Sequence, residues 1–486
     1  GSTLPSNTTG CCNIAIGRNT MYGNTTGTHN TALGNLALGC NTTGCDNAAL
    51  GTNALYGNTT GCYNVGVGYR AGWCNTTGSY NTALGFEALS NSLSGEANFA
   101  GGKYALWKNW GGNNNVGIGN CALRYNTTGP SNNAIGYQAL YCNTTGCNNN
   151  AIGSETLRDN TTGYFNNAIG RRALCKNTTG RDNNAIGRDA LYENTTGGQN
   201  NAIGPYALNK NTVGNYNTAI GDSALCGSLS GDHNFAAGNT ALYNNWGGCE
   251  NTAIGRCALY NNTTGNWNIG LGINTLKDNT EGKTNIALGY YVMCSNTTGC
   301  YNTGIGHQAL FANTTGVSNN GIGFYSLLNN TTGCNNTAIG QEALCSNTTG
   351  EYNTALGCKS LKGSLSGDHN FAAGNSTLYS NWSGCYNTAI GQQALYNNTT
   401  GNYNTAIGHS VLLGNKTGTL NIAIGSSSMY YANSGSDNLG MGYRALFNNW
   451  GGSCNVALGH GGLYNNTTGC CNNAIGYQPL YCNTTG

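Results

Sequence analysis

The chain has 486 residues, only 7% of them are charged, and its formal net charge is +2. So small and balanced a charge argues against capture of nucleic acid or of an anionic membrane as a main function. No apolar stretch approaches the roughly 18 residues that a bilayer-spanning helix needs, and no signal peptide is evident. The composition therefore predicts no membrane insertion and no nucleic-acid partner.

A tandem repeat of 17 residues occupies almost the whole chain. Residues 7–482 divide into 28 units without insertion or deletion, and residues 1–6 and 483–486 are partial repeats. The consensus is NTTGxxNTAIGxxALxx, numbered from its first Asn as positions 1 to 17, and residues 41–57 are a fair example. Gly stands at positions 4 and 11 and Asn at position 7 in every unit. No break in period marks a boundary, so the sequence predicts one array rather than several domains.

The elements expected in each unit follow from this spacing. Asn-Thr-Thr-Gly predicts a turn, positions 6 to 10 a short strand, position 11 onward a second turn, and positions 13 to 17 a second strand. The recurrent glycines leave no segment long enough for a helix. Position 15 is Leu or Met in 27 of 28 units, which indicates a buried stripe rather than disorder. The sequence thus predicts an all-β β-solenoid (β-roll or β-helix) of about 28 coils with two short strands per coil.

Positions 8 and 10 exchange volume. Position 10 is usually Ile, Leu or Val, but it shrinks in the three units that carry Phe at position 8. Residues two apart in a strand point to the same side, so we expect these two to share one pocket. Position 9 is always Ala or Gly, so its face is expected to meet a close neighbour. The exchanging pairs are Phe99 with Gly101, Phe235 with Ala237, and Phe371 with Ala373.

Stacking of the coils is expected on energetic grounds. One Ile and one Leu per coil bury too little apolar surface to offset the conformational entropy of a whole ordered unit. Backbone hydrogen bonds between coils, and ladders of Asn side chains at position 7, are therefore expected to stabilise the array cooperatively.

A longer period of 136 residues, or eight units, overlies the first. The segment at 228–239 (SLSGDHNFAAGN) returns unchanged at 364–375 and in altered form at 92–103, each time followed by an Asn-Trp turn. Duplication of an eight-unit block explains this pattern, and so does a lateral contact or a superhelical turn that recurs every eight coils.

Twenty of the 29 Asn-Thr-Thr-Gly slots are N-glycosylation acceptors. Asn is also a good turn residue, and five of the remaining slots keep Asn without the acceptor pattern. The sequence nevertheless predicts covalent glycans along one edge, with O-linked sugar on the paired Thr as a variant. The predicted N-linked sites are Asn7, Asn24, Asn41, Asn58, Asn75, Asn126, Asn143, Asn160, Asn177, Asn194, Asn262, Asn296, Asn313, Asn330, Asn347, Asn381, Asn398, Asn415, Asn466 and Asn483.

The 23 cysteines predict an oxidising, extracellular setting. Seventeen of them flank the Asn-Thr-Thr-Gly turn, where they are plausible staples, although spacing leaves the connectivity open. They are dispersed and no His joins them, so no metal site is expected. The candidate disulfides are Cys40 with Cys45, Cys142 with Cys147, Cys294 with Cys300, Cys62 with Cys74, and Cys334 with Cys345.

No pattern in the sequence indicates an enzyme. The His, Asp and Glu residues form no recurring pair, and no nucleophile elbow or phosphate loop is present. No catalytic residue and no bound cofactor is therefore expected. Tyr recurs at position 16, which predicts a stacked aromatic ladder or, alternatively, a carbohydrate-binding strip; its members are Tyr22, Tyr56, Tyr141, Tyr192, Tyr243, Tyr260 and Tyr396.

The segments Asn30–Gly34 (NTALG) and Asn251–Gly255 (NTAIG) resemble the coil of trimeric autotransporter adhesin heads. The full unit is still more similar to the NTAIGxxALxxNTTG arrays of phage tail-fibre-like proteins. The resemblance covers all 28 units and implies a β-roll fibre, often trimeric, displayed outside the cell. The sequons and cysteines also resemble those of heavily glycosylated extracellular fibrils.

Together these observations predict a structural protein, a glycan-decorated β-solenoid rod that assembles with itself, end to end or laterally, into an extracellular or surface fibre. The alternative is an adhesin or phage tail-fibre shaft that binds surface glycans. Ice binding is disfavoured, because the Thr residues at position 8 are interrupted by Asn, Ile and Phe.

Overall fold

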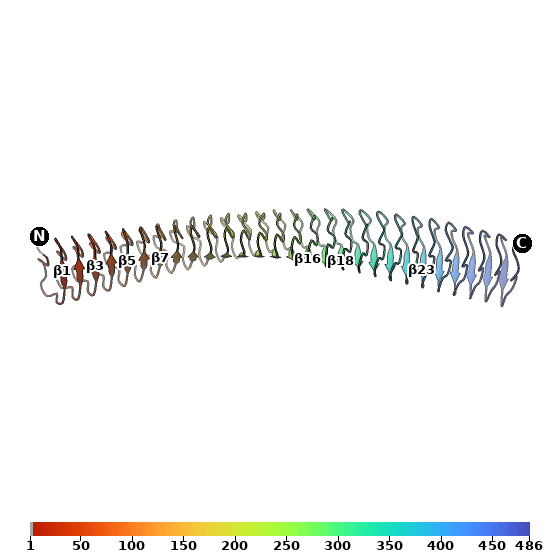
Figure 1. Ribbon diagram of the computed structural model, residues 1–486, viewed down its shortest axis with the longest axis horizontal. Coiled ribbons are helices and arrows are strands. Elements are labelled where there is room, and N and C mark those ends of the chain that lie inside the picture. The colour runs from red at the N-terminus through yellow and green to blue at the C-terminus, as the bar shows by residue number, and fades with distance from the viewer. Residues whose placement is uncertain (1–2) are drawn as a thin grey trace. The chain divides into compact units, whose positions relative to one another are not determined.

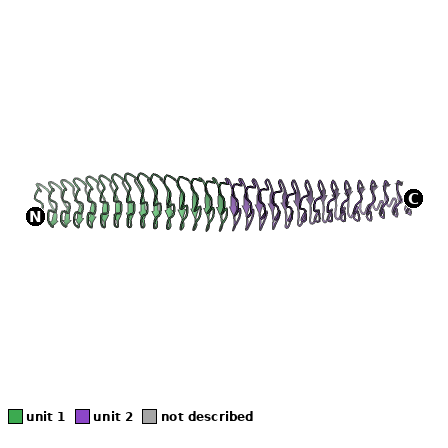
Figure 2. Cartoon of the chain, turned by 90° about the horizontal axis from the view of Figure 1, so that it is seen from above, with its two compact units in different colours: residues 1–247 green, residues 248–486 purple. Residues whose placement is uncertain are grey.

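A computed structural model describes residues 3–486. The chain falls into two compact units, residues 1–247 and residues 248–486 (Figure 2). Both are all-β, and no helix occurs among the described residues. Each coil of 17 residues contributes one strand of three residues, at positions 8 to 10.

The strands of the first unit are evenly spaced along the sequence. They are β1 (Ile14–Ile16), β2 (Thr31–Leu33), β3 (Ala48–Leu50), β4 (Val65–Val67), β5 (Thr82–Leu84), β6 (Phe99–Gly101), β7 (Val116–Ile118), β8 (Asn133–Ile135), β9 (Asn150–Ile152), β10 (Asn167–Ile169), β11 (Asn184–Ile186), β12 (Asn201–Ile203), β13 (Thr218–Ile220) and β14 (Phe235–Ala237).

The second unit repeats the same spacing. Its strands are β15 (Thr252–Ile254), β16 (Ile269–Leu271), β17 (Ile286–Leu288), β18 (Thr303–Ile305), β19 (Asn320–Ile322), β20 (Thr337–Ile339), β21 (Thr354–Leu356), β22 (Phe371–Ala373), β23 (Thr388–Ile390), β24 (Thr405–Ile407), β25 (Ile422–Ile424), β26 (Leu439–Met441), β27 (Val456–Leu458) and β28 (Asn473–Ile475).

Within each unit, consecutive strands pair in parallel, and every residue lies beside its equivalent in the next coil. Asn167 of β10, for example, pairs with Asn184 of β11, and Thr388 of β23 pairs with Thr405 of β24. The coils follow one another like the turns of a spring (Figure 1). The prediction of a β-solenoid with 17-residue coils is confirmed.

The predicted second strand at positions 13 to 17 does not form. Positions 13 and 15 instead adopt left-handed backbone angles in coil after coil, as at Leu36 (φ 59°) and Leu38 (φ 49°). This conformation is costly for a residue with a β-carbon, and burial of the position-15 side chain compensates for it. The alternation of right- and left-handed residues makes a tight turn here, so each coil has one strand and not two.

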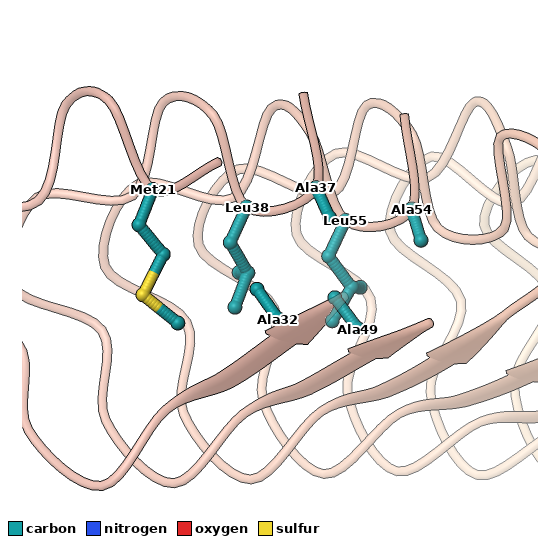
Figure 3. Close-up of a cluster of buried hydrophobic side chains, with 7 residues drawn as sticks. All are labelled: Met21, Ala32, Ala37, Leu38, Ala49, Ala54 and Leu55. Atoms are coloured by element: carbon teal, nitrogen blue, oxygen red, sulfur yellow. The ribbon is translucent and has the colours of Figure 1, made fainter. Parts of the chain in front are cut away.

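The core lies between this turn and the strand. The side chain at position 15 crosses the interior toward the Ala at position 9, as Figure 3 shows for Leu38 with Ala32 and Leu55 with Ala49. Nothing larger than Ala fits at position 9, and in some coils a side chain packed against it leaves room only for Gly. A Cβ added at Gly304, for instance, would lie only 2.5 Å from Cγ1 of Val292.

The side chains at positions 8 and 10 lie on the outer side of the strands, which we call the sheet face. They point to the same side, as predicted, but the expected burial of the Ile at position 10 is wrong. The Ile at position 10 is typically about two-fifths exposed, as at Ile169 (43%), whereas the Ala at position 9 is fully buried. Position 15 already fills the interior, so the large residue of the strand has to point outward.

The two invariant glycines have different causes. Position 11 has φ near +130°, as at Gly170 (+127°), and an added Cβ there would lie 2.6 Å from the carbonyl oxygen of Gly187 in the next coil. Position 4 has an ordinary φ, but an added Cβ at Gly180 would lie within 2.5 Å of both the Asn177 amide and the next coil's carbonyl. Both positions are structural.

Candidate functional surfaces

Two ladders of Asn side chains run through the interior of each unit. At position 7 the amide of Asn166 donates to Oδ1 of Asn149 (3.1 Å) and to the carbonyl oxygen of Gly180 (2.9 Å). At position 1 the amide of Asn177 donates to Oδ1 of Asn160 (2.7 Å) and to the same Gly180 oxygen (3.0 Å). The predicted ladder at position 7 is confirmed, and the second ladder was not predicted.

The ladder at position 1 is interrupted where the eight-coil blocks begin. Ser replaces Asn at Ser92, Ser228 and Ser364, and each of these buried hydroxyls lacks a hydrogen-bond partner. In the preceding coil, Oδ1 of Asn75 and of Asn347 is likewise buried and unpaired. The longer sequence period therefore marks recurrent breaks in the interior hydrogen bonding.

The predicted N-glycosylation sites conflict with this geometry. A sugar on Nδ2 would replace a hydrogen that the ladder uses and would need space in a filled interior. Only Asn7 is exposed and Asn483 half-buried. The other eighteen predicted acceptors have no exposed surface: Asn24, Asn41, Asn58, Asn75, Asn126, Asn143, Asn160, Asn177, Asn194, Asn262, Asn296, Asn313, Asn330, Asn347, Asn381, Asn398, Asn415 and Asn466.

The paired threonines of the turn have separate roles. The hydroxyl at position 2 donates to a main-chain oxygen of the next coil, as Thr161 does to Thr178 (3.0 Å). The side chain at position 3, such as Thr162, is exposed. O-linked decoration, which stays a prediction, would therefore fit position 3 better than position 2.

All 23 cysteines are free thiols in the structure, including the ten of the candidate disulfides, whose pairing stays a prediction. At position 5 the structure shows another role, because the sulfur accepts a hydrogen bond from a main-chain N–H of the preceding coil. Cys45 accepts from Thr28 (3.4 Å), and Cys300 accepts from Lys283 (3.3 Å). The hydroxyl oxygen of Ser79 likewise accepts a hydrogen bond from the main-chain N–H of Cys62 (3.1 Å). Cysteine is thus one of several acceptors suited to this slot.

Cysteines at position 16 lie deeper. Burial raises the pKa of the Cys175 thiol from 9.0 to about 11, and that of Cys294 equally to about 11. Both thiols are consequently protonated and unreactive near neutral pH. They are core residues rather than nucleophiles.

Aromatic residues form ladders on the outside of the coils. Tyr352, His369, Tyr386 and Tyr403 stack at position 6 with ring centroids 4.8, 4.8 and 4.9 Å apart. At position 16, Tyr396 stacks on Tyr379 (4.9 Å), so a ladder exists there as predicted. Neighbouring rings cover each other's faces, which leaves little open ring surface for a sugar. These ladders speak against a carbohydrate-binding strip along position 16.

A further cluster of aromatic side chains, which departs from the ladder pattern, lies between residues 69 and 141. The indole of Trp107 meets Tyr104 and Tyr125 edge to face (both 6.4 Å). The Arg124 guanidinium lies over the rings of Tyr104 (4.8 Å) and Trp107 (5.2 Å), and the Lys108 ammonium over Trp107 (5.5 Å) and Tyr125 (5.3 Å). Similar contacts between cations and aromatic rings occur elsewhere, as at Arg188 over Tyr206 (4.7 Å) and Arg444 over Tyr443 (4.9 Å), but with fewer rings around each cation than around Arg124.

An open groove of about 340 Å³ borders this cluster. It runs between position 17 and position 2 of three successive coils in the first unit. The sequence contained one signal for it, a Trp in a slot that is usually Thr. Position 17 and position 2 of the next unit are only two residues apart, as Lys108 and Trp110 are, but only the stacking of the coils shows that they line a groove. The groove is lined by Lys108, Trp110, Tyr125, Thr127, Cys142 and Thr144.

No group of three or more His, Cys, Asp or Glu side chains within residues 3–486 is placed to hold a metal ion. The same residues include no helix that could cross a membrane. Searches against protein-family models and against curated proteins found no match. The surfaces described above therefore carry the functional argument.

Proposed function

We propose that this chain is a structural fibre protein, a β-solenoid rod that packs laterally against other copies of itself through its sheet face. The observation that supports the proposal best is the volume exchange between positions 8 and 10, which takes place on an exposed surface. The ring of Phe99 covers Gly101, where an added Cβ would lie 3.2 Å from the ring. The ring takes the space that a larger residue at position 10 would fill, so the sheet face keeps one large, partly exposed apolar side chain in these coils as well.

The sheet face is also too large and too apolar for an ordinary free surface. At roughly 40% exposure, each Ile presents on the order of 70 Å², so the strands of one unit present on the order of 1,000 Å², more than the ~300–600 Å² patches of typical monomers. Stable interfaces bury about 800 Å² on each partner. The available area is therefore sufficient for association.

A second copy of the chain is the partner that fits this face. Its side chains recur once per coil, at the ~4.8 Å spacing between neighbouring strands. A partner with the same spacing places its ridges between these ridges along the full length of a unit. Irregular globular surfaces match only a few coils.

The test is the oligomeric state of a variant with three charges on the sheet face. Changes in every second coil keep the new ammonium groups apart, and a control carries the same charges on exposed turn residues of the same coils. The sheet-face variant combines Ile135→Lys, Ile169→Lys and Ile203→Lys. The control combines Thr128→Lys, Thr162→Lys and Thr196→Lys.

Sedimentation velocity and light scattering should find assemblies of the wild type and of the control, and a 50.3 kDa monomer for the sheet-face variant. Circular dichroism has to show that all three are equally folded. A monomeric wild type, or equal dissociation of both variants, would contradict lateral packing through this face.

The similarity of the repeat to adhesin-head and tail-fibre arrays agrees with a fibre displayed outside the cell. End-to-end joining and the extracellular location stay predictions. The position-5 cysteines weaken one argument for that location, because hydrogen bonding alone explains their presence.

A further inference from the structure

The groove beside Trp110 offers an aromatic face that no ring or cation of the described chain covers. Trp110 is 49% exposed, and within residues 3–486 its indole has neither an aromatic nor a cationic partner. Its Nε1–H donates no hydrogen bond to the described chain. The stacked tyrosines of the ladders, by contrast, cover one another.

The polar groups of the groove complement this platform. Lys108 has no carboxylate partner among the described residues, so its ammonium keeps its charge available. The hydroxyls of Thr127 and Thr144 already donate to main-chain oxygens (3.0 and 2.9 Å). Their oxygens therefore remain as acceptors for a ligand that brings its own hydroxyl donors.

The charge of the region favours an anionic ligand. Residues 92–142 contain three cations, Lys103, Lys108 and Arg124, and one carboxylate, Glu96. The resulting excess of two positive charges equals the formal net charge of the whole chain, +2. The segment around the groove therefore carries a net positive charge.

A second groove shares Trp, Tyr and Lys with the first, although its Lys416 stands at position 2 and no Thr lines it. In the second unit, a groove of about 160 Å³ is lined by Gly414, Lys416, Tyr431, Asn433 and Trp450. It again combines an exposed Trp at position 2 (58%) with a Tyr at position 17 and a Lys. The recurrence of Trp, Tyr and Lys in separate places indicates a binding arrangement rather than an isolated irregularity.

We propose that the groove at Trp110 binds a saccharide that carries a carboxylate. A pyranose ring would stack its C–H groups on the indole, its hydroxyls would donate to Thr127 and Thr144, and its carboxylate would pair with Lys108. The volume of about 340 Å³ suits one or two sugar rings. This site lies away from the sheet face and does not depend on lateral packing.

The test is titration of the full chain with digalacturonic acid and with its uncharged counterpart, galactobiose, by calorimetry and by saturation-transfer NMR. The decisive variant is Trp110→Thr, because Thr is the usual residue of this slot and should preserve the fold. The control is Trp382→Thr, which removes a Trp of the same slot that is 57% exposed but has Ser380 and Asn397 in place of Lys108 and Tyr125.

Trp110→Thr should weaken binding of the acid at least tenfold, whereas Trp382→Thr should leave it unchanged. Lys108→Asn should abolish the preference for digalacturonic acid over galactobiose while weak binding of both persists. Failure of both sugars to bind at millimolar concentration would overturn the proposal, as would equal effects of the two Trp variants. Stronger binding of a nucleoside monophosphate than of digalacturonic acid would refute the saccharide class.

Discussion

The Asn ladder at position 7 allows a quantitative test with Asn166→Ala. The Asn166 side chain takes part in four hydrogen bonds. Its amide donates to Asn149 (3.1 Å) and Gly180 (2.9 Å), and its oxygen accepts from the main-chain and side-chain N–H groups of Asn183 (both 3.1 Å). Truncation removes all four bonds at once.

The cost depends on which groups lose their last partner. The Gly180 oxygen still accepts from Asn177, and the Asn183 amide still donates to Gly197. The main-chain N–H of Asn183 loses its acceptor inside the coil. One orphaned buried donor together with three lost bonds gives a destabilisation of about 2–4 kcal/mol.

The matched control is the neighbouring substitution Asn167→Thr. Asn167 donates to Asn184 (3.0 Å) on the exposed sheet face, and Thr occupies this slot in many other coils. Its effect should stay within about 0.5 kcal/mol.

The measurement should be local as well as global, because repeat arrays need not unfold in one step. Urea denaturation followed by circular dichroism gives the overall change. Hydrogen exchange at the Asn183 amide should accelerate in Asn166→Ala and stay near the wild-type rate in Asn167→Thr. Equal exchange rates in the two variants would refute the role assigned to the ladder.

Four further outcomes follow from the structure. Gly170→Ala should destabilise by several kcal/mol in urea denaturation, because φ is +127° and the next coil is in contact, whereas Gly198→Ala, in a slot that accepts many residues, should cost less than about 1 kcal/mol. Ser364→Asn should raise the urea midpoint by restoring the interrupted ladder, worth about 1 kcal/mol, and an unchanged midpoint would contradict that reading. Iodoacetamide at pH 8 should label exposed Cys470 and spare Cys175, whose pKa of about 11 keeps the thiol protonated. Because the pKa of Cys175 is raised in the folded protein, the stability that this thiol contributes is present below pH 9.0 and is lost as the pH rises toward 11. Peptide mapping of the folded protein from a glycosylating host should find the eighteen buried sequons unmodified, and a sugar on any of them would contradict the buried ladder.

The sequence by itself determined the period, the parallel register and the glycine slots. An uninterrupted spacing of 17 residues puts each residue beside its equivalent in the next coil, so the pairing of Asn167 with Asn184 needed no further information. The Asn ladder at position 7 followed from the same register. These features are repeated locally, and a repeat reports them many times over.

The tertiary structure decided which side of the strand faces inward. In Asn-Ala-Ile, as at residues 167–169, the large Ile suggested the core, yet Ala168 is buried and Ile169 is 43% exposed. The reason is the width of the coil, because the Leu at position 15 reaches across and leaves room only for Ala. The same narrow coil buries the sequon asparagines and holds Leu38 in its left-handed backbone conformation. Stacking of successive coils also sets the neighbouring residues of positions 17 and 2 from three coils side by side to form the groove.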